Sequence, residues 1–199
     1  FVIKGPSDPG GALEGLSDLV QFRKGLLQSA LAATSIPQLQ EAYNAAPLLS
    51  AGINGTGQGI AIIAPGNYND SDIQRYWTNN GVSRALTSLL LRNARPSGPA
   101  DAEATLDIEL ASGMAPGSPI YVYFSGLDAV SILAALSQAV QDAQAINPTA
   151  DGGAAKPFLS ALSMSFTVCD AFLSQADVRA FETLFSALTS SGVTIFAAS

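Results

Sequence analysis

The chain has 199 residues, of which 48% are hydrophobic and 13% are charged, and its net charge is −7. This length and composition suit one domain with a sizeable core. The nine Lys and Arg residues are scattered, which argues against a nucleic-acid partner because neutralising phosphate needs clustered basic side chains. No apolar run reaches about 18 residues, so we expect no transmembrane helix and no membrane partner.

The chain divides into an N-terminal segment, 1–34, and a main domain, 35–199. An amphipathic pattern over 16–33 predicts a helix in the first segment, which we interpret as an extension or a prosegment remnant. Ser35 then has the position of an N-cap, with Pro37 in the first helical turn. The next predicted elements are a buried strand over 59–64, a helix over 71–80 and a polar, proline-containing connection over 81–101.

The second half of the chain continues the alternation of helices and strands. A helix is predicted around Glu103, followed by a strand over 120–124, a helix over 128–145, a strand over 158–166, a helix over 174–190 and a strand over 193–198. Strands that are apolar throughout and separated by helices predict an α/β fold, with a parallel sheet covered on both faces. Ligands bind at the carboxyl ends of such strands. Because the sequence stops after a strand, we expect it to be the front part of a larger folded unit.

Two carboxylates stand out in a chain that has no histidine. Glu103 and Asp107 are four residues apart in an otherwise apolar helix, so they share one helical face. Burial disfavours their charged forms, and a pair that shares a proton can perform acid–base chemistry without imidazole. Glu109 lies about 160° away from Asp107 on the helical wheel, and we expect it to be the exposed carboxylate. A solvated helix face or a structural network is the alternative for the pair.

Other motifs are less informative. The glycines of 55–59 invite a phosphate-loop interpretation, but they precede a strand rather than open a helix, so a turn is favoured. Ser163 and Ser165 could contact a substrate, although small core residues are common in such a strand. Cys169 is the single cysteine, so it is either a buried thiol or half of a bridge to another chain. No metal site is predicted from these residues.

Several motifs together resemble the sedolisin, or serine-carboxyl peptidase, family. The most specific is Glu103-x-x-x-Asp107, followed by Ala115-Pro116-Gly117 and the strand over 120–124. Further resemblances run in order through 36–44, 54–63, 162–165 with Cys169-Asp170, and 192–199. The resemblance therefore covers about 35–199, which would be the N-terminal part of the catalytic domain.

The resemblance implies a subtilisin-like α/β fold and a Ser-Glu-Asp triad that acts in acid. Glu103 would be the general base, and Asp107 would hold its proton and orient it, as the aspartate of a Ser-His-Asp triad orients histidine. Substrate polypeptide would lie near Ser163, Ser165 and Phe166. Some relatives extend the catalytic hydrogen-bond network with a glutamate and a tryptophan, at positions that here hold Ala64 and Phe166, so that extension is absent.

The resemblance also implies that this chain is incomplete as an enzyme. The oxyanion aspartate, the nucleophilic serine and the family's calcium site would lie beyond Ser199, so no cofactor is expected within this chain. We expect a second chain, produced by processing in an exposed loop, with Cys169 as the candidate for a disulfide to it. The expected protein is a serine-type endopeptidase that is secreted or held in an acidic compartment. The alternatives are a non-catalytic fragment or pseudoenzyme that acts as a binding module and, less favoured, a nucleotide-binding protein.

Overall fold

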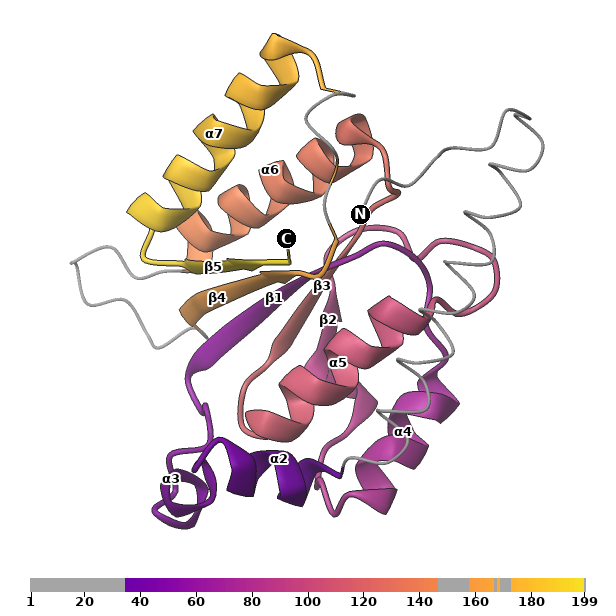
Figure 1. Cartoon of the computed structure of the whole chain (residues 1–199), viewed down its shortest axis with the longest axis vertical. Helices are drawn as coiled ribbons and strands as arrows, with labels where there is room; N and C mark the ends of the chain where they lie inside the picture. Colours follow the sequence, from indigo (N-terminus) through magenta and orange to yellow (C-terminus); the bar gives the residue numbers. More distant parts are fainter. Residues whose placement is uncertain (1–34, 147–157, 167, 169–172, 199) are drawn as a thin grey trace, which may run out of the picture.

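The computed structural model of the chain describes residues 35–146, 158–166, 168 and 173–198. All five of its strands are parallel and form one sheet in the order β2-β3-β1-β4-β5 (Figure 1). The strands are β1 (Gln58–Ala64), β2 (Leu89–Leu91), β3 (Ile120–Phe124), β4 (Phe158–Met164) and β5 (Thr194–Ala197). The predicted parallel sheet is therefore confirmed, and it is consistent with a subtilisin-like α/β fold.

Helices cover both faces of the sheet. The helices α4 (Asp70–Asn79) and α5 (Ala102–Met114), with α2 (Ile36–Ala42) beside them, lie on one side (Figure 1). The helices α6 (Ala129–Ile146) and α7 (Gln175–Ser190) lie on the other side. Two shorter elements, α3 (Ala46–Ser50) and the 3-10 turn η1 (Leu86–Ser88), complete the fold.

The central strand β1 is apolar along its length because it contributes to a core on each face. Ala61 and Ile63 belong to the cluster beneath α6 and α7. Ile62 and Ala64 belong to the cluster beneath α4 and α5. Residues 61–64 are all 0% exposed, so neither face of this strand can carry a polar side chain without a large desolvation cost.

The first helix of the domain is fixed at its start and packed against α5. The Ser35 hydroxyl accepts from the Gln38 amide, and Gln38 Oε1 accepts from the Ser35 amide at 2.8 Å, which confirms Ser35 as the N-cap. Ile36 is 1% exposed. It lies so close to Gly113 on α5 that a Cβ there would stand 2.3 Å from its Cδ1. The absence of a side chain at 113 therefore lets the two helices approach.

The structure corrects the prediction of an irregular connection over 81–101, because β2 lies within it and pairs with β3. This strand has only three residues, which is too short for a periodic signal. Strand β4 ends at Met164 rather than at residue 166. The predicted helix over 16–33 lies outside the described residues. Among the helices that the structure describes, none is long and apolar enough to cross a membrane.

An ion pair between a buried aspartate and a partly exposed arginine ties α6 to the end of β2. Asp142 is 6% exposed and accepts from Arg92 Nε and Nη2, both at 2.7 Å. It also accepts from the Tyr123 hydroxyl at 3.0 Å and from Gln138 at 3.2 Å. Burial raises the pKa of Asp142, but these donors outweigh it and hold the pKa below its usual value.

We predict that Asp142→Ala lowers the free energy of unfolding by about 2 kcal/mol, because the buried Tyr123 hydroxyl loses its acceptor and the partly exposed Arg92 loses its ion pair. Chemical denaturation at neutral pH measures this change. Glu41→Ala removes the same charge from an exposed position of α2 and should change the value by less than about 0.5 kcal/mol. Equal effects of the two substitutions would mean that the contacts of Asp142 contribute nothing specific to stability.

Candidate active site

The helix α5 begins at the carboxyl edge of the sheet. It connects β2 to the parallel strand β3, so its first turn lies near the carboxyl ends of the strands. Asp101 is its N-cap, and Asp101 Oδ1 accepts from the amides of Glu103 at 2.9 Å and Ala104 at 3.2 Å. The backbone of Asp101 bonds to the loop after β1, through its amide and the Asn67 carbonyl at 2.6 Å. The start of the helix is thus held against the sheet edge where ligands bind in such folds.

Asp107, one turn after Glu103, reaches the end of β4. The Ser165 hydroxyl donates to Asp107 Oδ1 at 2.7 Å. Asp107 Oδ2 is buried and has no hydrogen-bond partner among the described residues. The structure therefore brings together two residues that are 58 positions apart in the chain and that the sequence identified separately. An unpartnered carboxyl oxygen is costly in the charged form, and a proton on it would remove much of that cost.

Burial shifts both candidate acids toward their protonated forms. It raises the pKa of Asp107 from 3.8 to about 6, with the Ser165 hydrogen bond opposing the shift and the charges of Glu103 and Asp101 adding to it. The pKa of Glu103 is also raised, first by burial and then by Asp101. Each acid is therefore harder to ionise than in water, and Asp107 shows the large shift.

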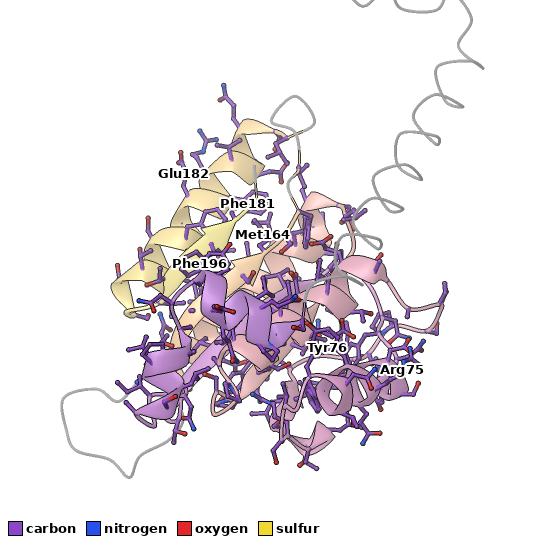
Figure 2. The ribbon with its side chains drawn as sticks, turned by 60° about the horizontal axis from the view of Figure 1, so that its bottom comes forward. Arg75, Tyr76, Met164, Phe181, Glu182 and Phe196 are labelled. Atoms are coloured by element: carbon purple, nitrogen blue, oxygen red, sulfur yellow. The ribbon has the colours of Figure 1, made fainter. Side chains whose placement is uncertain are left out.

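Glu109 is half-buried, which contradicts its expected role as the exposed carboxylate of the helix. Burial raises its pKa to about 7, the nearby charge of Asp72 adds to the shift, and Arg75 opposes it. Arg75 and Tyr76 lie on α4, which packs on this side of α5 (Figure 2). A helical wheel identifies the side that faces away from Asp107, but it carries no information about a second helix that covers that side.

The other predicted site residues lie on two faces of the sheet. Ser163 pairs with Ile62 and Phe196. Leu162 and Met164 belong to the cluster beneath α6 and α7, so Ser163 and Ser165 alternate onto the face of α5. Phe166 instead packs against the α6 and α7 cluster. The sheet therefore separates Phe166 from the Asp107 carboxyl, whereas Ser165 contacts it directly. Cys169 lies outside the described residues.

Phe166 lines an apolar cavity of about 280 Å³ between α6, α7 and the ends of β4 and β5. Met164, Phe181 and Glu182 border it (Figure 2), and Glu182 is the one charged residue of the lining. Nothing in this lining resembles acid–base machinery. Within the described parts of the chain, no three His, Cys, Asp or Glu side chains are grouped to hold a metal ion.

Asp101 was missing from the predicted site, although the sequence carries a signal for it. An aspartate directly before an apolar helical pattern is a typical N-cap, and its carboxylate raises the pKa of both Glu103 and Asp107. The candidate active site therefore consists of Asp101, Glu103 and Asp107, at the start of α5, with Ser165 bonded to Asp107. It defines an α/β domain with a partly buried pair of acids at the carboxyl edge of a parallel sheet.

Comparison with known proteins identifies a peptidase with a similar sequence. The chain is 34% identical over 155 residues to kumamolisin from Bacillus sp. (strain MN-32), a peptidase of the sedolisin family. The alignment covers 74% of this chain and 26% of kumamolisin, so the chain spans about a quarter of the length of this relative. No family model matches the chain. The similarity supports a distant sedolisin-like relationship, in agreement with the resemblance of the motifs.

The raised pKa of Asp107 predicts how stability depends on pH. The folded carboxyl binds its proton more tightly than the unfolded one, so its stabilising contribution is complete below about pH 4 and is lost as the pH rises through about 6. Asp107→Asn resembles the protonated form. We predict that it raises the free energy of unfolding at pH 7 by about 2 kcal/mol and leaves it nearly unchanged at pH 4.

Denaturation curves at the two pH values measure this difference. The control is Glu41→Gln, which removes an exposed carboxylate and should show no such pH dependence. An Asp107→Asn protein that is less stable than the parent at pH 7 would contradict the raised pKa.

Proposed function

We propose that the chain supplies the Glu-Asp pair of an acid-acting serine-carboxyl endopeptidase of the sedolisin type. The observation that carries this proposal is the buried Asp107 carboxyl, with one oxygen bonded to Ser165 and the other unpartnered, one helical turn from Glu103. The similarity to kumamolisin supports the same class of activity.

In the proposed mechanism Glu103 takes the proton of an attacking serine. A carboxylate is a weak base, so it works where the solution is acidic and where burial has raised its pKa. Asp107, with a pKa of about 6, keeps its proton in that range. Its protonated oxygen can then donate to Glu103, which orients the base and stabilises its negative charge.

The serine and the oxyanion aspartate would come from a second polypeptide that carries the C-terminal part of the catalytic domain. The proposal is supported by β5, which within the described residues has a neighbouring strand on one side only. Phe196 on this strand is 61% exposed (Figure 2), so a partner could extend the sheet there and cover an apolar side chain. A disulfide through Cys169 and a calcium site on the second chain belong to the same proposal.

The substrate would be a polypeptide that lies along the carboxyl edge of the sheet. Ser163 and Ser165 face α5, and Phe166 borders the apolar cavity, so the end of β4 offers polar contacts on one face and apolar contacts on the other. An enzyme with this acid–base pair would serve outside the cell or in an acidic compartment.

We predict that Glu103→Gln lowers peptidase activity of the two-chain protein at acid pH by at least about a hundredfold, because glutamine cannot accept the serine proton. The matched control is Glu109→Gln, which removes a half-buried carboxylate from the other side of the same helix and should retain activity. Hydrolysis of a denatured protein substrate between pH 3 and 5 is the assay. Full activity of Glu103→Gln would contradict the assignment of the base.

The second chain is tested by denaturing mass spectrometry with and without reductant. We predict an additional polypeptide beside the 20.4 kDa chain, released by reductant if Cys169 forms the link. A single species with no activity at any pH would favour the alternative, a non-catalytic binding module.

A further inference from the structure

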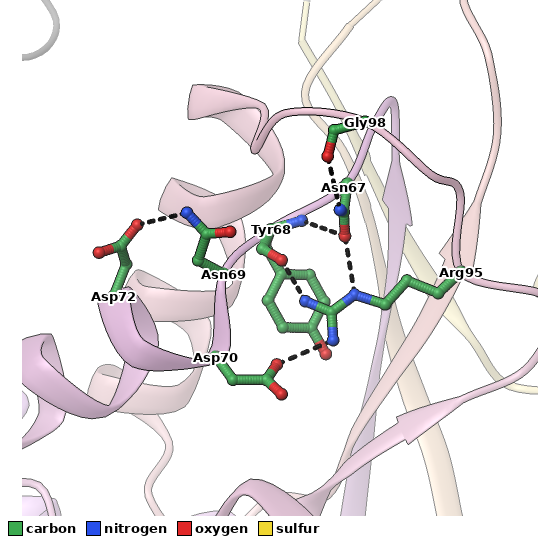
Figure 3. A network of polar contacts seen from close by, with 7 residues as sticks. All are labelled: Asn67, Tyr68, Asn69, Asp70, Asp72, Arg95 and Gly98. Atoms are coloured by element: carbon green, nitrogen blue, oxygen red, sulfur yellow. Dashed lines mark hydrogen bonds and ion pairs between the residues drawn. The ribbon is translucent and has the colours of Figure 1, made fainter.

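A single guanidinium group joins the two loops that precede α4 and α5 (Figure 3). Arg95, in the loop after β2, donates from Nε to Asn67 Oδ1 at 2.7 Å and from Nη1 to Asp70 Oδ1 at 2.9 Å. Its Nη2 donates to the carbonyl of Tyr68, and its guanidinium carbon lies 4.1 Å from the centroid of the Tyr68 ring. The flat fork of arginine thus meets three acceptors on three residues and an aromatic face.

Asn67 transmits this contact to the start of α5. Its side chain also donates to the Gly98 carbonyl at 3.0 Å, and its backbone forms a parallel bridge with Ala100. Its carbonyl accepts from the Asp101 amide at 2.6 Å. The side chain of Asn67 is therefore held by Arg95 together with the Tyr68 amide and the Gly98 carbonyl, and its backbone carbonyl holds Asp101.

Asp101 in turn holds the first turn of α5, through its bonds to the amides of Glu103 and Ala104. The loop after β1 also packs closely against Asp101, because a Cβ on Gly66 would stand 2.8 Å from the Asp101 Cβ. An unbroken series of contacts therefore runs from Arg95 through Asn67 and Asp101 to the backbone of Glu103. Asp107 has contacts outside this series, through the Ser165 hydroxyl and its buried neighbour Ile108.

We propose that Arg95 is a positioning residue for Glu103, which it places relative to Asp107 by fixing the loop that caps α5. As a statement about catalysis, this inference rests on the proposed function, in which Glu103 is the base. As a statement about the geometry of α5, it stands on the contacts alone. Arg95 acts on Glu103 rather than on Asp107. Its loss therefore changes the position of the Glu103 carboxyl relative to the Asp107 carboxyl and leaves the sheet intact.

The first experiment measures amide hydrogen exchange in the full chain. Arg95→Lys keeps the positive charge but cannot make the three separate guanidinium hydrogen bonds. Arg95→Gln removes the charge as well as the guanidinium group. We expect both variants to speed exchange at Glu103 and Ala104 by about tenfold, because the cap is loosened, while amides of β1 and β3 are unchanged. The control is Arg75→Gln, which breaks an ion pair with Asp72 on the surface of α4 and should leave these amides unaffected.

A carboxyl titration followed by NMR separates positioning from general stabilisation. The charge of Asp101 acts on both Glu103 and Asp107, and the charge of Glu103 acts on Asp107 as well. In the Arg95 variants we expect the midpoint of Glu103 to fall toward its ordinary value of 4.5, because the first turn becomes solvated. The midpoint of Asp107 should stay near 6. Exchange that rises equally at the Glu103, Ala104 and strand amides, or an unchanged Glu103 midpoint, would overturn the proposal.

Activity distinguishes this proposal from the one on which it rests. Full activity of Glu103→Gln would end the peptidase assignment, and the exchange data would still decide whether Arg95 places the start of α5. If Glu103→Gln is inactive, we expect Arg95→Lys to lower kcat more than it changes KM and to shift the acidic limb of the pH profile. An Arg95→Lys enzyme with an unchanged kcat and pH profile would overturn the positioning role and leave the peptidase assignment intact.

Discussion

The close approach of α5 to the sheet is the constraint on which the candidate site depends. Ala104 and Ile108 are 0% exposed and pack into the cluster shared with β1 and β3. Because they lie one turn apart, on either side of Asp107 in sequence, they draw the Asp107 carboxyl into an apolar environment. α2 and α4 cover the helix from other directions. Without this packing Asp107 would be a solvated surface acid with an ordinary pKa.

Burial also explains how a chain without histidine can hold a group that titrates near neutrality. Desolvation is the largest cause of the raised pKa at Asp107, Glu103 and Glu109. At Asp142 the same desolvation is present, but hydrogen bonds from Arg92, Tyr123 and Gln138 outweigh it and lower the pKa. One fold therefore contains buried acids of two kinds. Asp142 is matched by donors and serves the architecture, and Asp107 is left partly unmatched, which is typical of groups with chemical roles.

Much of this arrangement could be predicted from the sequence, because local patterns determine it. The apolar run of β1 predicts a strand that is buried on both faces, and Ser35 with Pro37 predicts the start of a helix. The i,i+4 spacing places Glu103 and Asp107 on one face. The half-buried state of Glu109 could not be predicted, since it depends on α4 packing against α5. The contacts of Arg95 could not be predicted either, because its acceptors on Asn67, Tyr68 and Asp70 come close to it only when two loops meet in the fold.

Within the described residues β5 lies at an edge of the sheet, which has a consequence for how these residues behave without a covering partner. Its four residues, Thr194–Ala197, include no charged side chain, no proline and no bulge, which are the usual means of preventing edge-to-edge pairing. At neutral pH the net charge of −7 keeps copies apart. Near the isoelectric point of 4.3 that repulsion disappears. The acidic range that suits the carboxylate chemistry is thus also the range in which this strand, while uncovered, most favours concentration-dependent self-association.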